Sequence, residues 1–146
     1  MNEELLMAWN SLKYYSEPAP KSLDASFFFR EMLPEINIDT REAAMDNIRT
    51  LYEHIAFQLN EVISDKQELV LTTGGGAMNE FLISLIREKY QLNLHFPDET
   101  LIKFKEAVIF AFMGLLRLRG EVNVLSSVTG SAEDHSAGKL DRGGAQ

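Results

Sequence analysis

The 146-residue sequence contains no cysteine, and it is poor in glycine and proline. The lack of thiols excludes a disulfide framework, a thiolate metal site and a cysteine nucleophile. With 9 Gly and 4 Pro the chain is not linker-like or collagen-like, and its 45% hydrophobic and 25% charged residues are ordinary for a globular protein. We therefore expect one folded domain over residues 1–130 and a partly flexible tail over residues 131–146.

Basic residues and long apolar runs are also scarce. The chain carries 14 Lys and Arg against 22 Asp and Glu, and residues 1–73, with 6 basic and 13 acidic side chains, hold most of the negative charge. This charge disfavours nucleic-acid binding and directs the search for a nucleotide site to the second half. The longest apolar run, Ala107 to Leu116, is too short to span a bilayer, and the acidic N-terminus does not resemble a signal peptide. We expect a cytoplasmic chain with no membrane partner.

Hydrophobic periodicity predicts a helix-rich α/β protein. Apolar residues recur at helical spacing in residues 3–15, 42–63, 81–90 and 101–118, while short apolar runs predict strands at 69–72 and 92–96. This order of helices and strands indicates a small parallel sheet flanked by helices. Whether residues 120–129 add a strand or an irregular edge stays open.

Two of these helices carry more specific expectations. Asp39 and Glu42 have the spacing of a capping box, so we expect Asp39 to cap the helix that follows. One apolar stripe should run along that helix, formed by Ile48, Leu51, Ile55, Leu59, Val62 and Ile63. The helix from Leu101 to Leu118 is apolar around nearly its whole circumference, which predicts that it is deeply buried.

The most informative motif is Gly74-Gly75-Gly76, between a predicted strand and a predicted helix. Three residues without side chains let backbone approach a ligand closely. Free N–H groups at a helix N-terminus would favour a phosphate, and the bare glycine surface would let an adenine or a ribose lie flat, with Asn79 facing the ligand. The same glycines are equally compatible with a structural tight turn that needs positive φ. The motif is neither a Walker A sequence nor a G-x-G-x-x-G fingerprint.

The other polar residues give weaker indications of chemistry. His54 and His95 are more typical of packing or surface positions than of ligands, and Asp134-His135-Ser136 has only the composition of a triad, because adjacent residues cannot adopt its geometry. No metal-ligand spacing is present. Glu106 is an acid within an apolar helix, so either it is buried with a partner or ligand, or it lies on a solvated strip beside Lys103.

Several short segments together resemble the final part of the anhydro-N-acetylmuramic acid kinase family. Their order and spacing match that family from about Pro18 to Gly138. The matching segments are Pro20–Leu23, Leu71–Asn79, Phe104–Phe112, Asn123 and Val128–Ser131.

The resemblance implies a two-lobed fold of the sugar kinase and actin-like ATPase type, of which this chain is most of the second RNase H-like lobe. It implies transfer of the ATP γ-phosphate to the sugar, with Mg²⁺, while water opens the 1,6-anhydro ring during recycling of cell-wall muropeptides. Gly74, Gly75, Gly76 and Asn79 match the adenosine-side motif, and Glu106 belongs to the signature helix near it. It implies no catalytic residue and no metal ligand in this chain.

The family's serine-rich and glycine-rich phosphate motifs and its catalytic aspartate segment have no counterpart here, so we expect the isolated chain to be inactive. Met78, Ser131 and Ser26 replace the family's usual His, Ala and Glu, and the first of these changes bears on how tightly nucleotide binds. The expected partners are an adenine nucleotide and the missing N-terminal lobe or parent chain. The alternative is a non-enzymatic remnant lobe that acts as an interaction or self-association module, and a third interpretation is an unrelated small α/β domain.

Overall fold

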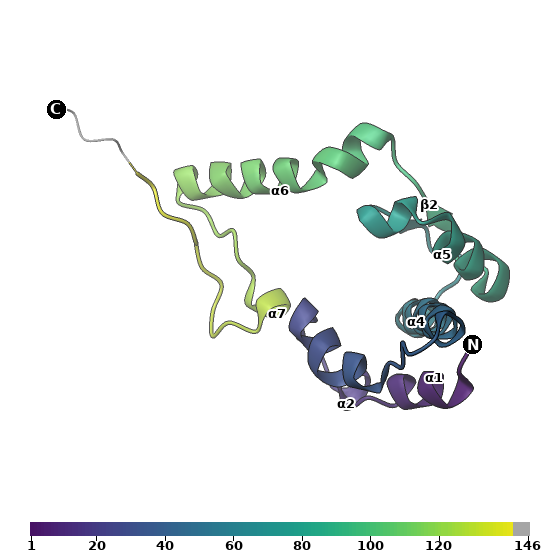
Figure 1. Cartoon of the computed structure of the whole chain (residues 1–146). Helices are drawn as coiled ribbons and strands as arrows, with labels where there is room; N and C mark the ends of the chain where they lie inside the picture. Colours follow the sequence, from purple (N-terminus) through teal and green to yellow (C-terminus); the bar gives the residue numbers. More distant parts are fainter. Residues whose placement is uncertain (142–146) are drawn as a thin grey trace. The chain divides into compact units, whose positions relative to one another are not determined.

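A computed structural model describes residues 1–141 and divides the chain into two compact units, each considered by itself. The first unit comprises residues 1–17 and 23–99, and the second comprises residues 18–22 and the chain from residue 100. Figure 1 labels the helices and strands of both. The expectation of one domain over residues 1–130 stays a prediction, and residues 142–146 of the expected tail lie outside the described residues.

The first unit begins with helices α1 (Glu3–Asn10) and α2 (Lys13–Ser16), where the sequence predicted one helix. The break falls at Ser11, whose hydroxyl donates to the carbonyl oxygen of Met7 at 2.8 Å and so competes with the backbone pattern. Three short helical segments follow, α3 (Ala25–Phe27), η1 (Phe28–Met32) and η2 (Leu33–Glu35). Their buried side chains form one cluster with those of α1: Leu5, Trp9, Phe27 and Met32.

Helix α4 (Arg41–Val62) confirms the predicted long helix but not its cap or its buried face. The cap is Thr40 and not Asp39, because the Thr40 hydroxyl accepts from the N–H of Ala43 at 3.1 Å. The predicted apolar stripe is only half-covered, with Ile48 50% and Val62 74% exposed. The buried positions instead form a largely polar set: Asn47, Thr50, Glu53, His54 and Ala56.

Polar residues occupy that face because the neighbouring segments offer them hydrogen-bond partners. The backbone N–H of Asn2 donates to the Thr50 hydroxyl at 2.9 Å, and the His54 ring lies 2.7 Å from the side-chain oxygen of Asn10. Buried polar groups are tolerated when they are paired in this way. Hydrophobic patterning alone therefore missed this polar part of the buried face, although Leu51, Ile55 and Ile63 of the predicted stripe pack partly buried against the two cores.

The two predicted strands form a small parallel sheet, β1 (Val70–Leu71) beside β2 (Leu94–His95). The N–H of Thr72 donates to the carbonyl oxygen of His95 at 2.8 Å. The connection between the strands contains η3 (Gly75–Met78), α5 (Glu80–Leu85) and η4 (Ile86–Tyr90). The core packed under it consists of Ala56, Leu82, Leu85, Ile86 and Leu92. A helix-rich chain with a small parallel sheet is thus confirmed, and it is compatible with an α/β fold.

The second unit is built on helix α6 (Glu99–Arg119), with α7 (Ser126–Thr129) and one isolated antiparallel bridge between Val124 and His135. The segment 120–129, left open by the sequence, therefore contributes a bridge and a short helix. No helix in the described part of the chain is long and apolar enough to cross a membrane.

The prediction that the helix from Leu101 to Leu118 is deeply buried is wrong, because no residue of α6 is buried. Phe104 is 58% exposed and Leu118 69% exposed. Within its own unit, α6 is contacted by Asn123, whose side chain donates to the carbonyl oxygen of Met113 at 3.1 Å. The loop and the short helix that follow α6 leave its apolar residues exposed.

Candidate functional site

The glycine turn directly follows β1, and the predicted order of strand, glycine turn and helix is confirmed. Gly74 has φ +83° and ψ −177°, a conformation that side-chain-bearing residues rarely adopt. The turn then closes through the N–H of Ala77 donating to the Gly74 carbonyl oxygen, and the N–H of Asn79 donating to that of Gly76, both at 3.1 Å. Backbone geometry therefore requires glycine at position 74.

Gly75 and Gly76 differ from Gly74, because nothing in the turn requires them to be glycine. Both are exposed, and neither has a positive φ. A Cβ atom added at either position would meet no atom within 4 Å. The turn thus presents a surface free of side chains, open to a flat ligand or to another part of a polypeptide.

An apolar hollow of about 370 Å³ adjoins the turn within the first unit. Thr73, Gly76 and Ala77 contribute to its wall from the turn, and Leu59 and Leu94 contribute from α4 and β2. Its lining is mostly aliphatic. Small-molecule sites typically combine such an apolar surface with a few polar groups.

Asn79 provides polar groups at the end of the turn. Its side-chain oxygen accepts from the N–H of Leu82 at 2.9 Å and so caps α5, while its Nδ2 donates to the Tyr52 hydroxyl at 2.8 Å. Because α5 has only six residues and one of its first N–H groups is already satisfied, the turn suits an uncharged ligand group better than a phosphate.

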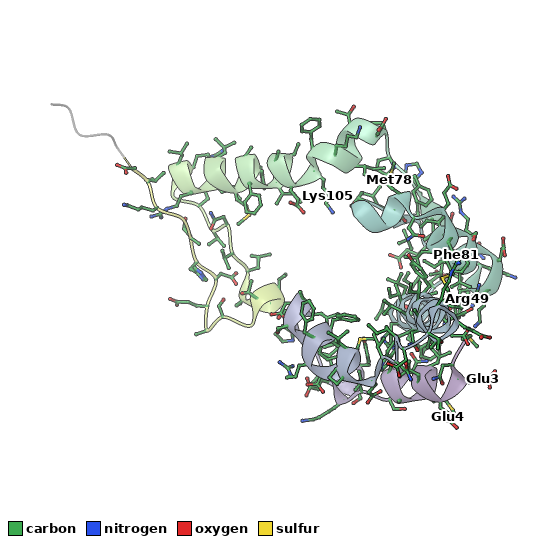
Figure 2. The ribbon with its side chains drawn as sticks, in the orientation of Figure 1. Glu3, Glu4, Arg49, Met78, Phe81 and Lys105 are labelled. Atoms are coloured by element: carbon green, nitrogen blue, oxygen red, sulfur yellow. The ribbon has the colours of Figure 1, made fainter. Side chains whose placement is uncertain are left out.

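A charged and aromatic network lies beside the turn, and the sequence analysis missed it. The carboxylate of Glu53, only 4% exposed, accepts from Arg49 at 2.6 Å and from Lys89 at 2.8 Å. The Arg49 guanidinium lies 4.8 Å from the centre of the Phe81 ring, which packs edge-on against Tyr52 at 5.2 Å. Figure 2 labels Arg49 and Phe81 in this region. The spacing of Arg49 and Glu53, four residues apart on a helix, was the signal available in the sequence.

The ion pairs determine the protonation of this network. Burial by itself would raise the pKa of Glu53, but hydrogen bonds from Lys89 and Arg49 and their positive charges hold that pKa below its usual range. The hydrogen bond to Glu53 raises the pKa of Lys89. Both cations are therefore committed to a carboxylate next to the turn.

The remaining candidate residues differ in their exposure and in their hydrogen-bond partners. Glu106 is exposed on α6 in the second unit, as the solvated-strip interpretation expects, and its assignment to the nucleotide site stays a prediction. His95 is exposed on β2, whereas His54 is buried on α4 and bonded to residues of α1 and α2.

The Asp134 carboxylate accepts from the N–H and the hydroxyl of Ser126, both at 2.7 Å, and these hydrogen bonds lower the pKa of Asp134.

Asp134, His135 and Ser136 therefore do not form a triad. His135 contacts the carbonyl oxygen of Glu133 through its ring, and Ser136 lies 3.4 Å from the Arg117 guanidinium. Among residues 1–141 no group of three or more His, Asp or Glu side chains could hold a metal ion.

The fold and the turn define a helix-rich chain with a small parallel sheet and an open glycine turn after its first strand. The family model for anhydro-N-acetylmuramic acid kinase matches residues 1–141. This chain belongs to the anhydro-N-acetylmuramic acid kinase family.

Curated relatives agree with the family model. The chain is 32% identical over 135 residues to the anhydro-N-acetylmuramic acid kinase of Actinobacillus pleuropneumoniae serotype 5b (strain L20), covering 87% of this chain and 37% of that protein. It is 30% identical over 137 residues to the protein of the same name from Sulfurovum sp. (strain NBC37-1), covering 89% of this chain and 37% of that protein. It is 29% identical over 147 residues to the anhydro-N-acetylmuramic acid kinase of Rhodococcus erythropolis (strain PR4 / NBRC 100887), covering 97% of this chain and 37% of that protein. The chain thus spans little more than a third of these relatives.

Proposed function

We propose that this chain supplies the adenosine side of the nucleotide site in an ATP-dependent anhydro-N-acetylmuramic acid kinase. The observation that carries the proposal is the open surface of Gly75 and Gly76 beside an apolar hollow, in a chain of this family. A purine is flat and largely apolar on its faces, so it fits a surface without side chains next to aliphatic groups. Gly74 holds the turn, and Asn79 offers hydrogen-bonding groups at its end.

The reaction in this proposal is transfer of the ATP γ-phosphate to the sugar while water opens its 1,6-anhydro ring, as in cell-wall muropeptide recycling. Such a transfer depends on groups that position and neutralise the phosphates, which Mg²⁺ and phosphate-binding loops supply. Arg49 and Lys89 are paired with Glu53, so we assign them no phosphate. We propose that the phosphate-binding groups lie in the part of a family kinase that this chain does not match, and that this chain forms part of one RNase H-like lobe.

Replacing Gly75 by valine is expected to weaken binding of Mg·ADP at least about tenfold, because the new side chain occupies the surface on which the nucleoside would lie. The fold should persist, since a Cβ atom at this position meets nothing within 4 Å. Binding is measured by NMR titration, with shifts expected at Gly74, Gly75, Gly76 and Asn79. Gly114→Val is the matched control, because it makes the same change at an equally open glycine on α6.

Two outcomes would count against the proposal. A folded chain that shows no binding at millimolar ADP would leave the glycine turn structural and favour the interaction-module alternative. Binding that Gly75→Val leaves unchanged would place the nucleotide elsewhere.

We propose as well that the remainder of a family kinase covers one face of α6. Six apolar residues recur along this helix with alternating spacings of three and four, the pattern of a helix-packing seam: Leu101, Phe104, Val108, Ala111, Leu115 and Leu118. All six are exposed. The half-buried residues of α6 lie on its other face: Ile102, Lys105, Met113, Leu116 and Arg117. Since the relatives are much longer than this chain, their additional polypeptide is the occupant that we propose for the seam.

Val108→Lys is expected to weaken association with that polypeptide at least about tenfold, because a charge would be buried in an apolar interface. The partner used is the part of the Actinobacillus pleuropneumoniae kinase that this chain does not match, with affinity measured by calorimetry. Phe110→Lys is the control, since Phe110 is as exposed as Val108 but lies off the seam. If the chain does not bind this polypeptide and instead self-associates through Val108, the result would contradict the proposal and support the self-association module.

A further inference from the structure

The side chain of Asn79 has its orientation fixed by two different partners. The N–H of Leu82 can only donate, so the atom facing it at 2.9 Å must be the oxygen Oδ1. The nitrogen Nδ2 consequently faces the Tyr52 hydroxyl at 2.8 Å and donates to it. Tyr52 comes from α4, 27 residues earlier in the chain, so this hydrogen bond ties the turn to a separate helix.

Because the Tyr52 oxygen accepts from Asn79, its own hydroxyl hydrogen points elsewhere and can donate to a further acceptor. Asn79 likewise keeps a second hydrogen on Nδ2. Both residues are half-buried, at the end of the turn whose glycines are open. The pair therefore keeps two hydrogen-bond donors next to a surface without side chains.

The Tyr52 ring is itself held in place. It packs edge-on against Phe81 with the ring centres 5.2 Å apart, and Phe81 lies under the Arg49 guanidinium. Arg49 is fixed by the buried carboxylate of Glu53, which also binds Lys89. This succession of contacts helps to hold the tyrosine ring in place, and it engages both nearby cations with the same carboxylate.

We propose that Tyr52 is a positioning residue for the nucleoside half of the ligand, an inference that rests on the proposed function. Tyr52 holds the Asn79 amide in one orientation and adds its own hydroxyl, so that the two groups donate to uncharged acceptors such as a ribose hydroxyl oxygen or a purine ring nitrogen. The phosphates make no contact here, because Arg49 and Lys89 are already paired with Glu53.

Tyr52→Phe tests this role, because it removes one oxygen and keeps the ring that packs on Phe81. We expect affinity for adenosine and for Mg·ADP to fall by the same factor, about fivefold, the ratio that one neutral hydrogen bond supplies. Without any ligand, the NMR signals of the Asn79 side-chain amide should shift, while the thermal unfolding midpoint stays nearly constant. Tyr15→Phe is the matched control, since it removes a hydroxyl that is hydrogen-bonded to His54 in the other hydrophobic cluster of the unit.

The outcomes separate the two proposals. If the unaltered chain binds neither adenosine nor Mg·ADP, the proposed function fails and the role of Tyr52 fails with it. If the unaltered chain binds both ligands and Tyr52→Phe binds them equally well with unmoved Asn79 signals, the proposed function stands and the positioning role is overturned. A loss confined to Mg·ADP would also overturn it, because the contact would then involve phosphate.

Discussion

Replacing Trp9 by alanine is expected to destabilise the first unit by about 3 to 5 kcal/mol, the usual cost of truncating a fully buried tryptophan. Trp9 has no exposed surface and packs with Leu5, Phe27 and Met32, so its removal leaves a cavity between α1 and α3. Its indole N–H has no hydrogen-bond partner, so the loss is one of packing and not of a polar contact.

The measurement is urea unfolding followed by far-ultraviolet circular dichroism, since Trp9 is the chain's single tryptophan and the variant has no indole signal. Met7→Ala is the control, because Met7 lies on the same helix but is 63% exposed. The control should change the free energy of unfolding by less than about 0.5 kcal/mol. A Trp9→Ala change below about 1 kcal/mol would show that α1 does not pack stably on the unit.

The secondary structure was largely predictable from local pattern, and the buried surface was not. Helical periodicity located α4 and α6, and short apolar runs located β1 and β2, because these signals depend on neighbouring residues. Which face of α4 is buried depends on Asn2 and Asn10, residues far away in the sequence that accept or donate hydrogen bonds. No helical-wheel argument contains that information.

The error about α6 has a different physical origin. An apolar helix predicts that something covers it, but periodicity does not say whether the covering polypeptide belongs to the same chain. In the described residues the seam around Val108 is uncovered, and the curated relatives are far longer than this chain. The apolar pattern of α6 therefore indicates that the helix needs a covering surface, but it does not identify the polypeptide that supplies that surface.

The site was predictable in its backbone and unpredictable in its side-chain partners. The glycine run after an apolar strand was enough to place the turn, and Gly74 proves to need its positive φ. The contact of Asn79 with Tyr52 joins two segments whose relative position only tertiary packing sets. The burial of Glu53 could not be predicted, because sequence alone does not reveal that Lys89 approaches it.

Lowering the pH from 6.5 to 4 is expected to remove about 3 kcal/mol of stability through His54 alone. Burial lowers the pKa of His54 from 6.5 to about 4. Its Nδ1 lies 2.7 Å from the Asn10 side-chain oxygen, which accepts only, so Nδ1 carries the proton of the neutral ring and Nε2 accepts from the Tyr15 hydroxyl at 2.8 Å. Among residues 1–141, the hydrogen-bond partners of the ring are Tyr15 and Asn10 and include no carboxylate that would stabilise an imidazolium.

The direction of the effect follows from which state binds protons. Between pH 6.5 and pH 4 the unfolded chain protonates its histidine while the folded chain keeps His54 neutral, so protons favour unfolding. The contribution of His54 to the free energy of unfolding is therefore complete above pH 6.5 and declines as the pH falls towards 4. Below pH 4 it no longer changes. Glu53, whose folded pKa is lowered, adds a second loss that begins only as the pH approaches the ordinary carboxylate range.

Urea unfolding monitored by Trp9 fluorescence at pH 7, 5.5 and 4.5 measures this dependence, since the Trp9 and His54 rings are 6.0 Å apart. In His54→Gln the free energy of unfolding should be lower at pH 7 but nearly constant down to pH 5, because glutamine does not titrate. His95→Gln is the control, as His95 is exposed and should leave the slope of the unaltered chain intact. A His54→Gln variant with the same pH slope as the unaltered chain would show that another group carries the acid sensitivity, and that the buried histidine is not kept neutral by the fold.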